Sequence, residues 1–209
     1  MRLESMKAII GTYRRRHYIE RALDSVRTHA TGITEFVFID DSGDRENADW
    51  LRSFGTVVET GASGYGKAMR AACAAAEGET SLWWEEDFVA VTDIDLDHMA
   101  DILTRRPYLA QLALLRGPHF SVEHEHGGVI EALQAKGHTF REINGVIEHE
   151  ATFTGNPSVW RGSVFAAGWP RARWSEDRKR RNLLRGGYRF GYLPGIRVEH
   201  DGVRSGHGY

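Results

Sequence analysis

The sequence predicts an α/β fold with a mainly parallel central sheet that is covered by helices on both faces. Apolar runs of strand length alternate with segments of helical periodicity, and most of these runs are continuously apolar, as in strands buried on both sides. The chain has 209 residues, of which 41% are hydrophobic, which is enough for one domain with a sizeable core but tight for two. We therefore expect residues 1–209 to form a single domain.

The first half of the chain supplies the regular alternation of strands and helices. Strands are predicted at residues 7–13, 34–41, 55–60, 81–91 and 108–116. The first helix is indicated by an apolar face that consists of Ile19, Ala22, Leu23 and Val26. An alanine-rich helix begins near Lys67 and stops at Gly78, and a further helix at 92–106 has Thr92 or Asp93 as its cap. Residues 42–49 are rich in turn formers.

The second half of the chain is less regular. Periodicity fades between residues 117 and 155, where we expect loops or an antiparallel excursion. Order returns with residues 156–168, and a helix is then predicted at 175–187, followed by a final strand at 189–202.

The composition narrows the partners that the protein can have. The net charge of −2 gives no overall attraction to nucleic acid or to an anionic membrane. The single cysteine, Cys73, excludes an internal disulfide and fits a reducing compartment, so we expect a cytoplasmic protein. No apolar segment approaches the roughly 20 residues of a membrane span, so any membrane role would be peripheral.

The segment from Gly61 to Ala68 almost matches the phosphate-binding loop G-x-x-x-x-G-K-[ST] of P-loop NTPases. Ala68 takes the place of the hydroxyl that would hold Mg²⁺, so a P-loop is disfavoured. A glycine loop at a helix start can still contact a ligand through free backbone N–H groups, and Lys67 adds a positive charge. The alternative is a tight turn that merely needs flexible glycines.

Polar residues gather at the predicted strand ends, which is where α/β sheets bind ligands. Three adjacent acids, Glu85, Glu86 and Asp87, end one apolar strand. Their mutual repulsion favours a divalent cation, and strand alternation places Glu85 and Asp87 on the same face. An exposed strand end with solvated charges is the alternative interpretation.

Six segments occur in an order and at spacings that are typical of one family. They are AIIGTYRRRHYIERALDSV, EFVFIDDSGD, GASGYGKAMRAA, LWWEEDF, SEDRKRRNLLRGG and VEHDG. Together they resemble family 2 glycosyltransferases of the GT-A fold. The resemblance implies a Rossmann-like three-layer α/β/α sandwich in which residues 1–115 bind the nucleotide sugar and residues 116–209 form the acceptor side. A soluble form this small resembles stand-alone enzymes of bacteria and phages.

The resemblance also implies roles for residues on the donor side. The donor nucleotide would contact Thr12, Tyr13, Arg14, Asp40, Asp41, Gly64, Lys67, Glu85 and Glu86. Asp87 would hold the metal, Mn²⁺ or Mg²⁺, with Glu85 and His200 as further ligands, and an imidazole ligand suits Mn²⁺ somewhat better. Glu85 departs from the D-x-D element of the family, and its longer side chain changes the reach to the ion.

The acceptor side carries the remaining roles. By resemblance Asp177 would be the catalytic base, with Glu176 beside it, although Ser175 followed by two acids is also an ordinary helix start. Asn156 and Trp160 would contact the acceptor or the donor sugar. Basic side chains that could add charge near the phosphates are those of Arg178, Lys179, Arg180, Arg181, Arg185 and Arg204.

The activity that the resemblance implies is transfer of a hexose, with inversion, from a nucleotide-diphosphate donor to an acceptor hydroxyl. A UDP-sugar is the favoured donor, and the acceptor would be a glycan, a small molecule or a protein. Such a transfer needs a cation for the departing diphosphate and a carboxylate for the hydroxyl proton. A sugar nucleotidyltransferase of related fold, a binding protein without turnover and a P-loop kinase are the alternatives. The oligomeric state stays open.

Overall fold

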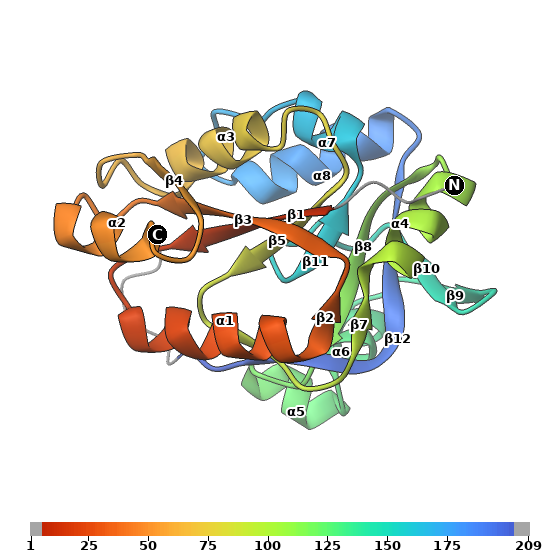
Figure 1. Ribbon diagram of the computed structural model, residues 1–209. Coiled ribbons are helices and arrows are strands. Elements are labelled where there is room, and N and C mark those ends of the chain that lie inside the picture. The colour runs from red at the N-terminus through yellow and green to blue at the C-terminus, as the bar shows by residue number, and fades with distance from the viewer. Residues whose placement is uncertain (1–5, 203–209) are drawn as a thin grey trace.

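The computed structural model describes residues 6–202 and has the three-layer α/β/α architecture that the sequence predicts (Figure 1). Within this range one sheet of ten strands crosses the molecule, and helices cover both of its faces. Arg204 lies outside the described residues.

The strands are numbered in chain order. Those of the main sheet are β1 (Met6–Thr12), β3 (Ile33–Asp40), β4 (Thr56–Glu59), β5 (Ser81–Glu85), β6 (Phe88–Ala90), β8 (Leu109–Arg116), β9 (Phe140–Ile143), β10 (Val146–His149), β11 (Ser158–Trp160) and β12 (Arg189–His200). They are ordered β4-β3-β1-β5-β11-β8-β12-β10-β9, with β6 paired to β12. Strands β4, β3, β1, β5, β8 and β12 point the same way, and β11 runs antiparallel between β5 and β8. A separate pair joins β2 (Ala30–Thr31) to β7 (Ile94–Asp95).

The register of the parallel strands brings their carboxyl ends to one edge of the sheet. Thr12 of β1 is paired with Asp40 of β3, and Asp40 is paired with Glu59 of β4. On the other side of β1, Gly11 is paired with Glu85 of β5. Polar residues that are far apart in the sequence therefore meet at this edge, where α/β sheets bind their ligands.

The helices divide between the two faces of the sheet (Figure 1). They are α1 (Arg16–His29), α2 (Arg45–Leu51), α3 (Tyr65–Ala75), α4 (Leu96–Arg105), α5 (Ser121–His126), α6 (Val129–Ala135), α7 (Gly162–Ala166) and α8 (Ser175–Arg185). Residues of α1 and α4 pack into one core with Trp84, whereas residues of α3, α7 and α8 pack into a second core with Trp83. Trp83 and Trp84 point to opposite faces because successive strand residues alternate.

The structure differs from the sequence prediction where strands and helices meet loops. The turn-rich segment 42–49 contains the start of α2, because Asp44 caps this helix by accepting the backbone N–H groups of Glu46 and Asn47. The strand predicted at 81–91 ends at Glu85, and its second part, β6, leaves β5 and pairs with β12.

The cap of α4 also differs from the prediction. It is Asp95, which accepts the N–H of His98, rather than Thr92 or Asp93. In residues 117–155 the hairpin of β9 and β10 confirms the expected antiparallel excursion, whereas the two helices α5 and α6 were not predicted. The buried residues of α1 are Ile19, Ala22, Leu23 and Val26, which confirms the predicted apolar face.

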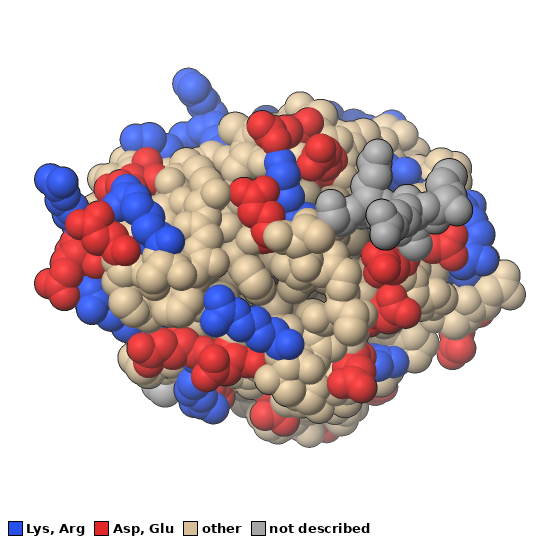
Figure 2. All heavy atoms as spheres, in the orientation of Figure 1, with Lys and Arg blue, Asp and Glu red and all other residues tan. Residues whose placement is uncertain are grey.

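The surface carries both signs of charge. On the face drawn in Figure 2, basic and acidic side chains are interspersed, in keeping with the net charge of −2. Across residues 6–202, the helices are too short or too polar to cross a membrane.

Candidate active site

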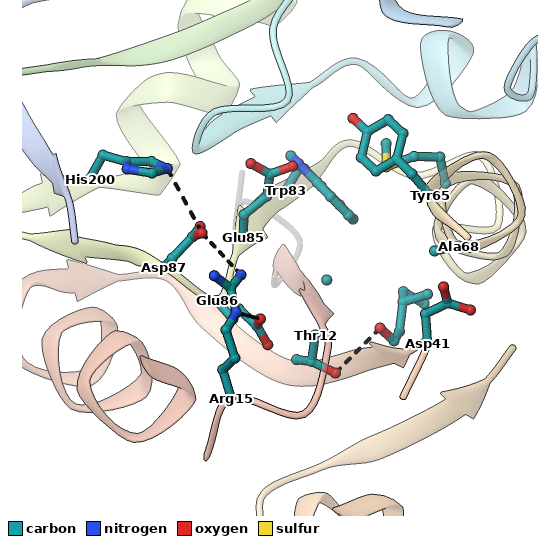
Figure 3. A pocket seen from close by; sticks show the side chains of 13 residues that line it. Thr12, Arg15, Asp41, Tyr65, Ala68, Trp83, Glu85, Glu86, Asp87 and His200 are labelled. Atoms are coloured by element: carbon teal, nitrogen blue, oxygen red, sulfur yellow. Dashed lines mark hydrogen bonds and ion pairs between the residues drawn. The ribbon is translucent and has the colours of Figure 1, made fainter. Parts of the chain in front are cut away.

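A cavity of about 230 Å³ opens at the carboxyl ends of β1, β3 and β5. The start of α3 and the end of β12 complete its walls (Figure 3). Its lining residues are Gly11, Thr12, Arg15, Ile39, Asp41, Tyr65, Ala68, Met69, Trp83, Glu85, Glu86, Asp87 and His200. The fold thus brings together six residues that the sequence assigned to the donor or the metal, which are Thr12, Asp41, Glu85, Glu86, Asp87 and His200.

Asp41 holds the glycine loop that follows β4. Its carboxylate accepts the N–H groups of Ser63 and Gly64, both at 2.8 Å, and the hydroxyl of Thr60. Lys67 also turns back to this loop, since its ammonium donates to the Thr60 carbonyl at 3.0 Å and to the Ser63 hydroxyl at 3.1 Å. These two amides and this ammonium therefore stabilise the loop itself, which differs from the predicted outward contact with a ligand.

Two other predicted donor contacts have partners outside the cavity lining. Asp40 accepts hydrogen bonds from Ser42 and from the side chain of Asn47, so it secures the start of α2. Arg14, whose φ is +60°, donates through Nε to the Ser42 carbonyl at 2.8 Å. In this structure both residues shape the loops around the cavity.

Arg15 is a cavity residue that sequence reasoning missed. Its guanidinium donates to Glu86 through Nε at 2.5 Å and to Asp87 through a terminal nitrogen at 3.0 Å (Figure 3). Glu86 is 2% exposed and also accepts the backbone N–H of Tyr13 at 2.6 Å. Burial raises the pKa of Glu86 to about 7, although Arg15 and the Tyr13 N–H act in the opposite direction. The run of three arginines after β1 was the only signal, and it does not indicate which one turns inward.

Asp87 and His200 form the candidate metal pair. Nε2 of His200 lies 3.8 Å from Oδ2 of Asp87, which is too long for a hydrogen bond but lets both atoms reach one ion at about 2.1 Å. Burial lowers the pKa of His200, which keeps the imidazole neutral, as a metal ligand must be. Gly202 makes room for the pair, because a Cβ there would lie only 2.6 Å from Oδ2 of Asp87.

This donor set fits Mn²⁺ or Mg²⁺ as a partial shell. One carboxylate and one imidazole leave positions that a bound diphosphate and water would fill. Within residues 6–202, no group of three or more His, Cys, Asp or Glu side chains is placed to hold an ion. This donor set therefore suits an ion that would bind together with a ligand, and Arg15, which pairs with Asp87, would then share that carboxylate with the ion.

A second group of acids lies on the face of the sheet that α3 and α8 cover. Burial, with the nearby Glu176 as the next cause, raises the pKa of Glu85 well above its usual range. Glu176 accepts a hydrogen bond from the Tyr65 hydroxyl at 2.6 Å and another from the backbone N–H of Gly155. Burial raises the pKa of Glu176 by more than these two bonds lower it. A Cβ at Gly155 would lie 2.8 Å from Oε1 of Glu176 and 3.0 Å from Oε1 of Glu85, so these groups converge there.

Neither Asp177, the predicted base, nor Glu176 is among the residues that line the cavity, but Glu176 accepts a hydrogen bond from Tyr65, which does line it. The carboxylate of Asp177 pairs with Arg180 at 3.0 Å and with Arg181 at 2.8 Å, and its side chain is 47% exposed. Lys179 is buried and donates to two backbone carbonyls, so its ammonium stabilises the fold and does not face the donor cavity. Helix α8 thus turns Glu176 inward and presents Asp177 to the surface.

The two predicted acceptor contacts have different environments. Trp160 is 0% exposed and stacks on Phe165 and Trp169, so its ring belongs to the core and offers no face to an acceptor. Asn156 lines a second cavity of about 330 Å³, which α5, α6 and β12 border. Only Asn156 is therefore placed where an acceptor could reach it.

The arrangement defines a class of protein. A three-layer α/β/α sandwich with an acidic cavity at the carboxyl ends of its parallel strands is the arrangement expected of a nucleotide-binding α/β protein, and the GT-A fold is one of this class. A comparison with protein families matches residues 8–151 to the family described as glycosyl transferase family 2. Because this match spans more than half of the chain, the protein belongs to glycosyl transferase family 2.

Solved structures share this fold at low sequence identity. Mannosyltransferase PcManGT from Pyrobaculum calidifontis, in complex with GDP-Man and Mn²⁺, has a TM-score of 0.68 at 18% identity, over 96% of this chain and 58% of that chain. S. aureus TarS in complex with UDP has a TM-score of 0.59 at 19% identity, over 93% and 60% of the two chains. GalNAc-T7 with UDP, GalNAc and Mn²⁺ has a TM-score of 0.69 at 12% identity, over 96% and 44%. The chain spans about half the length of these proteins. No curated protein matches it.

Proposed function

We propose that the chain is a metal-dependent inverting glycosyltransferase that moves a sugar from a nucleotide-diphosphate donor to an acceptor hydroxyl. Membership in glycosyl transferase family 2 supports sugar transfer. Two of the similar structures contain UDP and one contains GDP-Man, so a UDP-sugar is the donor that we favour. The acceptor hydroxyl would belong to a glycan, a small molecule or a protein.

The donor would lie in the cavity at the strand ends. Ile39, Ala68 and Met69 supply an apolar wall that suits a nucleobase. Asp41 can accept a further hydrogen bond from the donor nucleotide. Its Oδ2 already accepts the Gly64 N–H, but each carboxylate oxygen can accept more than one hydrogen bond. Thr12 lies at the end of β1 beside this group.

Asp87 and His200 would hold Mn²⁺ or Mg²⁺ beside the donor. A divalent cation in this place supplies the charge that stabilises the departing diphosphate. Arg15, which is bonded to Asp87, brings a second positive charge to the same side of the cavity. Support for a metal comes from this donor set and from the Mn²⁺ in two of the similar structures.

Glu176 is the general base of this proposal, and its buried position carries the assignment. As the acceptor oxygen bonds to the anomeric carbon, the bond from that carbon to the diphosphate oxygen breaks, and the hydroxyl proton passes to Glu176. Attack opposite the leaving group inverts the anomeric centre. A buried carboxylate with a raised pKa is a stronger proton acceptor than a solvated one, whereas Asp177 is paired with two arginines at the surface.

Adjacent variants on α8 test this assignment. Glu176→Gln removes the proton acceptor with little change in volume, so we expect kcat to fall by about 100-fold or more while UDP still binds. Asp177→Asn is the matched control and should keep kcat close to that of the wild type. The measurements are initial rates with a panel of UDP-sugars and calorimetric UDP binding with Mn²⁺. Loss of transfer in Asp177→Asn together with retained transfer in Glu176→Gln would assign the base to Asp177.

The same assays separate the alternative activities. Pyrophosphate release from UTP and a sugar 1-phosphate would indicate a sugar nucleotidyltransferase. UDP binding without turnover of any donor or acceptor would indicate a binding protein of this fold. A P-loop kinase is disfavoured by Ala68 and by Lys67, whose ammonium is bonded within its own loop.

A further inference from the structure

Tyr65 joins two parts of the chain that the fold brings together at the cavity. It is the first residue of α3, directly after the glycine loop, and it lines the cavity. Its hydroxyl donates to Oε1 of Glu176 at 2.6 Å, although 111 positions separate the two residues in the sequence. In Figure 3 the hydroxyl end of Tyr65 points from α3 toward the side of the cavity where Glu85 lies.

The surroundings hold the two side chains in one geometry. The ring of Tyr65 stands edge-on to Trp169, with centroids 6.0 Å apart and planes at 86°. Gly155 closes the space from the loop side, since a Cβ there would lie 2.8 Å from Oε1 of Glu176 and 3.0 Å from the Tyr65 hydroxyl. The Gly155 N–H is the second donor to Glu176. Two protein donors therefore fix this carboxylate.

The other carboxyl group that faces Glu176 is Glu85 on β5. Two carboxyl groups at this range disfavour each other's ionised form, so a hydrogen-bond donor to Glu176 helps to hold its carboxylate beside the cavity wall. The phenol supplies this donor without adding a charge. Removal of the hydroxyl would leave the Gly155 N–H as the remaining one of these two donors, so the carboxylate would be held less firmly.

We propose that Tyr65 is a positioning residue that orients Glu176 for proton transfer and links the donor loop to this step. The inference rests on the proposed function. Asp41 lines the donor cavity and binds the N–H groups of Ser63 and Gly64, which directly precede Tyr65. The loop that Asp41 holds therefore places the Tyr65 hydroxyl beside Glu176.

Deletion of single hydroxyl groups tests the proposal. Tyr65→Phe should lower kcat by about tenfold, because a misplaced base loses rate, while KM for the donor and the affinity for UDP stay near the wild-type values. Tyr188→Phe is the matched control, since the Tyr188 hydroxyl bonds Ser163 and does not line the cavity. It should leave kcat unchanged. An unchanged kcat in Tyr65→Phe would overturn the proposal.

A double mutant shows whether Tyr65 acts through Glu176. In the Glu176→Gln background, Tyr65→Phe should lower kcat no further, because the residue that it positions is already lost. Effects that multiply would assign Tyr65 a separate role and overturn the proposal. Gly155→Ala places a methyl group against the same carboxylate from the other side and leaves Tyr65 intact. This variant should also lower kcat by a larger factor than the factor by which it raises KM.

A spectroscopic readout separates this inference from the proposed function. The carboxyl ¹³C resonance of Glu176, assigned by its absence in Glu176→Gln, should shift in Tyr65→Phe and stay in place in Tyr188→Phe. An unshifted resonance would show that Tyr65 does not hold Glu176, whatever the activity. A shifted resonance in a protein that transfers no sugar would instead overturn the proposed function.

Discussion

Glu176 and Asp177 are adjacent in the sequence, yet Glu176 is bonded to Tyr65 of the cavity lining and Asp177 pairs with surface arginines. Consecutive residues of a helix point about 100° apart. Which of two adjacent acids faces inward therefore depends on how the helix is rotated about its axis, and the sequence of the pair does not decide this. Packing of Leu183 into the core sets the rotation of α8. The sequence indicated an acidic pair at a helix start, and the tertiary structure turns Glu176 inward and Asp177 outward, which is why we propose Glu176 as the base.

At the same scale, the pH dependence of transfer reports the environment of Glu176. Burial raises its pKa, and transfer needs the ionised form, so kcat should fall as the pH drops through a value above the usual glutamate pKa of about 4.3. Tyr65 lowers the pKa of Glu176, so Tyr65→Phe should move this acid limb to higher pH. Rates from pH 4 to 9 measure both effects. An acid limb at 4.3 or below would contradict the assignment.

At the level of elements, local patterns predicted most of the sheet and the long helices. The apolar face of α1 and the apolar run of β8 lie where the sequence placed them, because periodic burial is a local property. The break after Glu85 was not predicted. It depends on pairing of β6 with β12, which is more than 100 residues away, and no local pattern encodes such a pairing.

The short helix α5 is an element that depends on a tertiary ion pair. Glu123 lies in its first turn and forms two hydrogen bonds with the guanidinium of Arg116, both at 2.7 Å, and both side chains are buried. Burial alone would raise the pKa of Glu123, but the bonds from Arg116 and from the N–H groups of Phe120 and His119 outweigh it and lower the pKa to about 2.

Glu123→Gln should therefore lower the free energy of unfolding at pH 7 by about 3 kcal/mol, because it leaves Arg116 buried without its counterion. The folded pKa lies below the unfolded value of about 4.3, so the contribution of Glu123 is present above pH 4.3 and is lost as the pH falls toward 2. Urea unfolding at several pH values measures the free energy of unfolding of the variant and of the wild type. The difference between the two should become smaller as the pH falls from about 4.3 toward 2. Glu125→Gln, at an exposed position of α5, is the control. A gap that does not change with pH would contradict this account.

At the level of the whole molecule, ligand binding should stabilise the fold, because the cavity exists only in the folded chain. At 100 times its Kd, UDP with Mn²⁺ should add about 2.7 kcal/mol, which corresponds to a rise in Tm of about 5–10 °C for a protein of this size. A thermal melt with UDP and EDTA should show a smaller rise, and His200→Ala should remove the part that depends on Mn²⁺. Equal shifts with Mn²⁺ and EDTA would contradict a metal at Asp87 and His200.

The sequence by itself determined the layered α/β architecture, the family resemblance and most of the acids at the strand ends. These features follow from local periodicity and from motifs within single segments. Both depend only on residues that are near one another in the chain. Only the tertiary structure decided that Arg15 bridges Glu86 and Asp87, that Trp160 is core and that Tyr65 bonds Glu176. These contacts join segments that are distant in the sequence, and they depend on how helices rotate and strands pair when the core closes. The loop that resembled a P-loop is, in the folded chain, bound to Asp41 and places Tyr65 beside Glu176.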